Sequence, residues 1–194
     1  MKASPVLAER NLVYRNLGDL AFAETSAAWG LDHEGVAFGA ASGDLDGDGD
    51  LDLVHVSMDG DVTVCRNDSP GGNRLIVALQ GTRSNRFGVG ATVRIETEAG
   101  VQVRTLTLAR GYLSTSEPVL HFGLGDLARV RRMTVDWPSG HRQVVTDLAA
   151  GQRYTIVEPA EGAIPPPPAP TAPLFVDITP ATNLNVPNRE GALN

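Results

Sequence analysis

The sequence predicts an all-β protein with a small antiparallel sandwich or barrel over residues 71–158. Glycine and proline are plentiful in the 194-residue chain, at 21 and 13 residues, and aromatic residues make up only 5%. Such a composition is typical of short strands joined by tight turns. Seven short apolar or β-branched runs support this prediction, at 75–79, 91–95, 101–106, 120–122, 133–137, 143–145 and 154–157. Glycine or proline turn signals separate several of them, as expected for a sandwich or barrel.

Residues 44–52 carry the strongest chemical signal in the first 70 residues. Five aspartates fall within these nine positions: Asp44, Asp46, Asp48, Asp50 and Asp52. Two carboxylates 4 Å apart repel by about 4 kcal/mol at an effective dielectric near 20, so a cation is expected among them. Calcium prefers oxygen ligands of this kind. We expect side-chain oxygens from four of these aspartates and a backbone carbonyl from Asp50 to bind Ca²⁺; the alternative is a solvated Asp/Gly turn.

The aspartate spacing matches the start of an EF-hand loop, but the rest of the pattern does not. An EF-hand needs a bidentate glutamate at its twelfth position, and the twelfth residue counted from Asp44 is His55. Residues 51–56 are short, apolar and β-branched, with no helical period. We therefore expect the loop to lead into a strand. Gly47 and Gly49 are expected to let the backbone curl by adopting positive φ.

Phe38-Gly39 followed by the aspartate loop resembles the FG-GAP (VCBS-type) repeat. That resemblance implies that residues 1–70 form a blade region of an integrin-like β-propeller, with the loop holding calcium. Residues 22–31 are echoed at 175–184, so we expect a truncated further repeat at 174–194, after a proline-rich linker at 159–173. A propeller typically needs four to eight blades, which favours a fragment of a longer protein.

Four motifs in the second region occur in a specific order: residues 84–91, 111–114, 121–125 and 137–140. They resemble the ASPIC/UnbV domain, which follows FG-GAP repeats in the cartilage acidic protein-like family. Asn85 and Arg86 in the first motif are a candidate ligand loop for a carboxylate, a sugar or a partner backbone. The alternative is ordinary turn chemistry, since Ser-Asn and glycine are common turn residues.

The sequence gives no support for catalysis. A triad drawn through Ser114, His121 and Asp136 has no nucleophile elbow around the serine. His33 and His55 flank the aspartate loop but lack the spacing of a zinc site. The acidic residues converge in one loop, whereas glycoside hydrolysis needs two carboxylates across a cleft. We therefore expect a protein that is not an enzyme.

Composition excludes several partners. The formal charge is −7, which argues against nucleic acid, because nucleic-acid surfaces are clustered and basic. No apolar run is long enough to span a membrane, and the N-terminus has no signal-peptide core.

The single cysteine, Cys65, cannot form an internal disulfide and is expected to be a small buried hydrophobe.

Together these observations favour a non-catalytic, calcium-binding β module of an extracellular or cell-envelope protein. Its expected role is adhesion or protein–protein interaction, with a protein or glycan as partner. The alternatives are a carbohydrate- or matrix-binding module and an accessory domain of a larger secreted enzyme.

Overall fold

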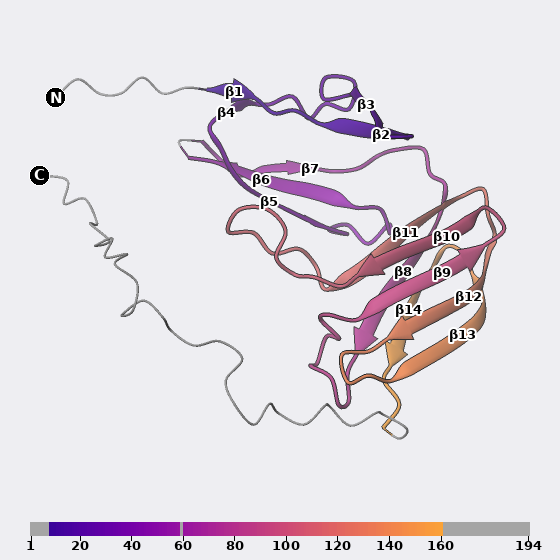
Figure 1. The fold of residues 1–194 in the computed structure, drawn as a ribbon. Coiled ribbons are helices and arrows are strands. Elements are labelled where there is room, and N and C mark those ends of the chain that lie inside the picture. The colour runs from indigo at the N-terminus through magenta and orange to yellow at the C-terminus, as the bar shows by residue number, and fades with distance from the viewer. Residues whose placement is uncertain (1–7, 59, 161–194) are drawn as a thin grey trace, which may run out of the picture. The chain divides into compact units, whose positions relative to one another are not determined.

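The structure is a computed structural model that describes residues 8–58 and 60–160 (Figure 1). All of them belong to one compact unit, Met1–Ile164. Every regular element among them is a β-strand, so the predicted all-β class is confirmed. The linker at 159–173, apart from its first two residues, and the repeat start at 174–194 lie outside the described residues. No helix in the described part of the chain has the length and apolar character needed to cross a bilayer.

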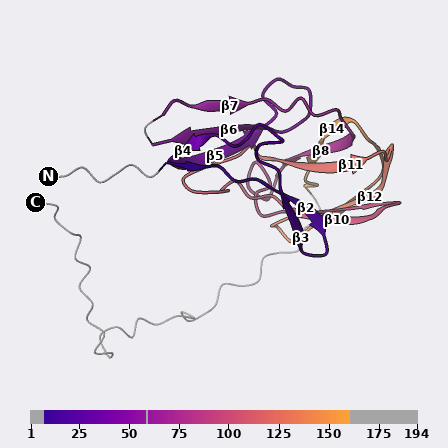
Figure 2. The ribbon, with the colours of Figure 1, turned by 90° about the horizontal axis from the view of Figure 1, so that it is seen from above.

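The N-terminal part consists of three small sheets. Strand β1 (Glu9–Arg10) pairs with β4 (Glu34–Gly35), and β2 (Tyr14–Gly18) forms a hairpin with β3 (Ala21–Glu24). The third sheet is antiparallel and contains β5 (Ala37–Gly43), β6 (Asp52–Ser57) and β7 (Thr63–Cys65). These three strands lie side by side in both views, with β6 in the middle (Figure 2). The aspartate loop joins β5 to β6, so the strand expected after the loop is confirmed.

The second part is a two-sheet sandwich, which confirms the seven expected strands. Its strands are β8 (Asn73–Gln80), β9 (Thr92–Thr97), β10 (Gly100–Thr105), β11 (Val119–Gly125), β12 (Arg129–Asp136), β13 (Arg142–Ala149) and β14 (Gln152–Val157). One sheet has the order β10-β9-β12-β13 and the other β11-β8-β14. Neither closes into a barrel.

The prediction of a wholly antiparallel sandwich is wrong at one strand, because β14 runs parallel to β8. Strands β13 and β14 are consecutive but belong to different sheets. The two residues between them form a corner, where Gly151 has a φ of +70° and donates its N–H to the carbonyl of Arg74 (2.7 Å). The chain therefore reaches the second sheet running in the direction of β8.

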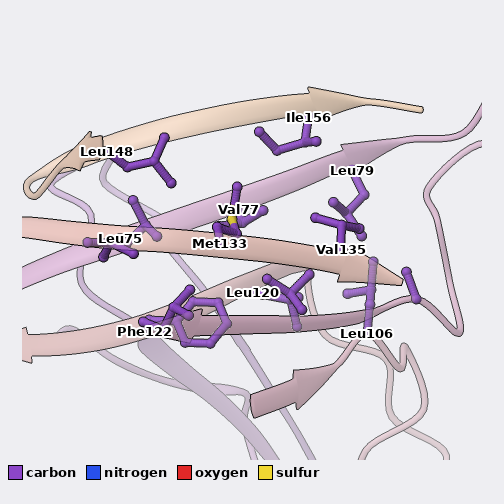
Figure 3. Close-up of a cluster of buried hydrophobic side chains, with 14 of the residues drawn as sticks. Leu75, Val77, Leu79, Leu106, Leu120, Phe122, Met133, Val135, Leu148 and Ile156 are labelled. Carbon is purple, nitrogen blue, oxygen red and sulfur yellow. The ribbon is translucent and has the colours of Figure 1, made fainter. Parts of the chain in front are cut away.

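The hydrophobic core lies between the two sheets of the sandwich (Figure 3). Alternate residues of the strands point inward, as the period of two requires. The buried set is Leu75, Val77, Leu79, Ala91, Val93, Ile95, Leu106, Leu120, Phe122, Leu124, Val130, Met133, Val135, Trp137, Leu148 and Ile156. By contrast, large apolar side chains of the N-terminal part are exposed, including Tyr14, Phe22 and Trp29.

The connection between β10 and β11 links the sandwich to the outer edge of β5. The Ser114 hydroxyl accepts the backbone N–H of Ala40 (3.0 Å), and the Ser116 hydroxyl accepts that of Ser42 (3.2 Å). The backbone N–H of Glu117 donates to the carbonyl of Ser42 (3.3 Å). These contacts cover backbone groups that an edge strand otherwise leaves unpaired.

Candidate metal centre

Three carboxylates of the aspartate loop converge. One oxygen each of Asp44, Asp46 and Asp48 lies within 4.8 Å of the other two. The same carboxylates shape the loop, since they accept the N–H groups of Gly47 (2.9 Å), Asp48 (3.2 Å) and Asp50 (2.8 Å) respectively. Such Asx-type bonds curl the backbone tightly. The resulting all-oxygen donor set suits a hard cation such as calcium.

The expected conformations of the two loop glycines are confirmed. Gly47 has a φ of +80° and Gly49 a φ of +91°, in the left-handed region that favours glycine. A Cβ atom on Gly49 would collide with the guanidinium group of Arg74. This position therefore requires glycine for two reasons, its backbone conformation and the close approach of that arginine.

Asp52 is the buried acid of the loop, with only 3% of its surface exposed. Its carboxylate accepts the backbone N–H groups of Asn67 and Leu45, both at 2.8 Å. These two hydrogen bonds lower the pKa of Asp52 below its ordinary value. The residue thus ties the start of the loop to the segment after β7, and it is not among the three converging carboxylates. Direct ligation by Asp52 stays a prediction.

Two side chains from the sandwich reach the aspartate loop. Arg74, on β8, forms an ion pair with Asp50 (3.3 Å). The Glu117 carboxylate accepts the backbone N–H of Asp44 (3.5 Å) and is itself paired with Arg153 on β14 (3.0 Å). Sequence reasoning missed these residues, since nothing in their own segments marks them as neighbours of the loop.

The candidate ligand loop, Asn85 and Arg86, lies between β8 and β9. Both ends of the Asn85 amide are used within the loop, because Oδ1 accepts the N–H of Val89 (2.8 Å) and Nδ2 donates to its carbonyl (2.7 Å). Arg86 is exposed, and its guanidinium lies 5.4 Å from the centre of the Phe87 ring. A ligand role for this pair stays a prediction, with Arg86 as its more available member.

Glu158 holds the start of that same loop and was not anticipated. Its carboxylate accepts the N–H groups of Thr82, Arg83 and Ser84 (2.9, 2.9 and 2.8 Å) and the hydroxyls of Ser84 and Ser139. Burial alone would raise the pKa of Glu158, but the hydrogen bonds outweigh it and lower the pKa to about 2. The residue therefore connects the end of β14 to two turns, the β8–β9 loop and the β12–β13 turn.

Two residues of the rejected triad, Ser114 and Asp136, have structural partners, whereas the buried Nε2 of His121 has no hydrogen-bond partner among the described residues. The Ser114 hydroxyl donates to the carbonyl of Tyr112 (2.7 Å), in addition to accepting from β5. Asp136 pairs with Arg142 across the β12–β13 hairpin.

Residues 81–163 match the family model for ASPIC and UnbV. The ASPIC/UnbV part of the resemblance is therefore confirmed. Cartilage acidic protein 1 of Homo sapiens is 32% identical over 151 residues, which cover 76% of this chain and 22% of the relative. The Mus musculus protein of the same name is 32% identical over 151 residues, covering 76% and 23%. The protein of that name from Xenopus tropicalis is 34% identical over 129 residues, covering 64% and 20%. The chain thus spans about a fifth of the length of these relatives.

Proposed function

We propose that this chain is a non-catalytic, calcium-binding β module of an extracellular or cell-envelope protein, serving adhesion or protein–protein interaction. The observation that carries the proposal is the convergence of Asp44, Asp46 and Asp48 within 4.8 Å. Within residues 8–58 and 60–160, none of these three carboxylates forms a salt bridge with a basic side chain. Calcium would supply the missing positive charge.

Bound calcium would act first as a structural ion. It would fix the conformation of the loop between β5 and β6. The Arg74–Asp50 ion pair and the hydrogen bond from Asp44 to Glu117 would connect the fixed loop to the sandwich. Extracellular calcium modules often have Kd values of about 10⁻⁴–10⁻³ M. At millimolar calcium, such an affinity gives occupancy from about one half upward.

The comparisons support the extracellular and non-catalytic parts of the proposal. The sandwich matches ASPIC and UnbV, and the relatives carry the name of a cartilage protein. An FG-GAP blade in the N-terminal part is supported by the β5–β6–β7 sheet and by the exposed Tyr14, Phe22 and Trp29. Neighbouring blades of a propeller would cover such apolar side chains.

Isothermal titration of calcium into the purified chain tests the proposal. We expect one binding event in the wild type and none in the double variant Asp46→Asn, Asp48→Asn. The matched control is Asp126→Asn, an exposed aspartate after β11, which should bind calcium as the wild type does. Absence of binding heat in the wild type at millimolar calcium, or equal binding by the double variant, would contradict the proposal.

A carbohydrate-binding function has one specific observation in its favour. Trp29, which is 53% exposed, lines a cavity of about 560 Å³ together with Arg66 and Asn67. An aromatic face beside hydrogen-bonding groups is a common setting for polar ligands with an apolar side. Tryptophan fluorescence during titration with sugars tests this function, and a response that persists in the Asp46→Asn, Asp48→Asn variant would assign it independently of calcium.

A further inference from the structure

His55 is a buried imidazole without hydrogen-bond partners. It lies on the central strand β6 and is 7% exposed. Neither Nδ1 nor Nε2 has a partner among the described residues. Leaving a buried polar group unsatisfied destabilises the folded state, so a native structure needs a reason to keep one.

The fold brings Cys65 and His33 to this imidazole. In the β6–β7 register, Leu53 is opposite Cys65 and His55 is opposite Thr63. Residues two apart share a face of a strand, so His55 and Cys65 lie diagonally on the same face. His33 comes from the segment before β4, where its carbonyl accepts the N–H of Asn11 (2.9 Å). The His33 and His55 rings are 5.0 Å apart, and one ligand atom from each of the three residues lies within 4.8 Å of the others.

We propose that His33, His55 and Cys65 form a second metal site, selective for a borderline-soft dication such as zinc. Two imidazole nitrogens and a thiolate are typical zinc ligands and poor calcium ligands. Tetrahedral zinc with Zn–N near 2.0–2.1 Å and Zn–S near 2.3 Å separates donor atoms by about 3.3–3.6 Å. The donor atoms of the present cluster lie within 4.8 Å of one another, so binding would require the side chains to rotate toward the ion.

The surroundings of the cluster suit metal uptake. Cys65 lines the cavity of about 560 Å³ beside Trp29, and His33 is exposed, so two of the three ligands can be reached from solvent. Burial, and then the neighbouring His33, lower the pKa of His55 below its ordinary value, which favours the neutral form that binds metal. On binding, the Cys65 thiol would give up its proton to solvent. Three protein ligands leave a fourth position open for water or a group from a partner.

This site could not be predicted from the sequence, because its ligands are 22 and 10 positions apart. Zinc motifs are recognised by pairs of ligands separated by a few residues. His33 and His55 lack zinc spacing in the sequence, but the fold places their rings 5.0 Å apart, and the β6–β7 register places Cys65 on the same face as His55.

Zinc alone, and cobalt as its spectroscopic substitute, test the proposal on the full chain in a phosphine reductant that keeps Cys65 reduced. We expect one equivalent of zinc to bind, and cobalt to give a thiolate-to-metal charge-transfer band in the near ultraviolet. Cys65→Ser should abolish that band. Both Cys65→Ser and His33→Ala should weaken zinc binding at least tenfold. These two side chains are less buried than His55, so their variants are expected to fold.

Two controls separate this site from other binding. His141→Ala, in the β12–β13 turn, should bind zinc as the wild type does. The Asp46→Asn, Asp48→Asn variant should also keep zinc binding, which makes the result independent of the calcium proposal. Failure of the wild type to bind zinc, a cobalt spectrum without the thiolate band, or unchanged affinity in both Cys65→Ser and His33→Ala would overturn the inference.

Discussion

Replacement of Glu158 by glutamine should destabilise the sandwich strongly. The carboxylate accepts three backbone N–H groups, from Thr82, Arg83 and Ser84, and two serine hydroxyls. Its pKa of about 2 in the folded protein, against an ordinary value of 4.5, corresponds to about 3 kcal/mol of stabilisation at neutral pH. Since a domain is stable by only about 5–15 kcal/mol, Glu158→Gln should fold but unfold at a markedly lower urea concentration.

The pH dependence gives a sharper test of the same carboxylate. Because the folded-state pKa is lowered, the stabilisation is fully present above pH 4.5 and is lost as pH falls toward about 2. The difference in unfolding free energy between wild type and Glu158→Gln should therefore shrink over this range. Urea unfolding from pH 7 down to pH 2 measures it, with the exposed Glu98→Gln as control. The reasoning is refuted if the variant matches the wild type at pH 7, or if the difference is independent of pH.

Three further variants test the packing of the core, the aspartate loop and the contacts between the sandwich and β5. Phe122→Ala should lower the free energy of unfolding by about 3–5 kcal/mol in urea titrations, because the ring is fully buried in the core; a loss below 1 kcal/mol would contradict the packing. Gly49→Ala should lower the free energy of unfolding by about 1–2 kcal/mol, because its backbone is in the left-handed region, and should displace the guanidinium group of Arg74. The control variant Gly71→Ala, with open space around the added methyl group, should leave the free energy of unfolding unchanged in the same urea titrations. Ser114→Ala combined with Ser116→Ala should speed hydrogen exchange of the β5 amides that these hydroxyls accept; unchanged exchange would show that the edge is protected by other means.

The strands of the sandwich could be predicted because their side-chain period is local. Val93 and Ile95, for example, alternate with polar residues, and both are fully buried. The direction of β14 could not be predicted, since it depends on which sheet the chain enters after Gly151. The pairing partner of a strand is a non-local property that the strand's own residues do not encode.

In the candidate sites, too, local features could be predicted and contacts between distant segments could not. The aspartate spacing predicts the loop, its glycine conformations and the following strand, because all of these are set within about a dozen residues. The ion pair from Arg74 and the anchor at Glu158 depend on contacts between segments far apart in the chain. The cluster of His55 and Cys65 with His33 likewise exists only once the strands are in register.

Thermal unfolding in calcium and in EDTA tests the central claim, calcium binding by the aspartate loop, most directly. With a Kd of about 10⁻⁴–10⁻³ M, about 10 mM calcium should stabilise the folded chain by roughly 1.4–2.7 kcal/mol. The predicted result is a higher Tm in calcium that EDTA reverses and that the Asp46→Asn, Asp48→Asn variant lacks. An identical Tm in calcium and EDTA for the wild type would contradict the account.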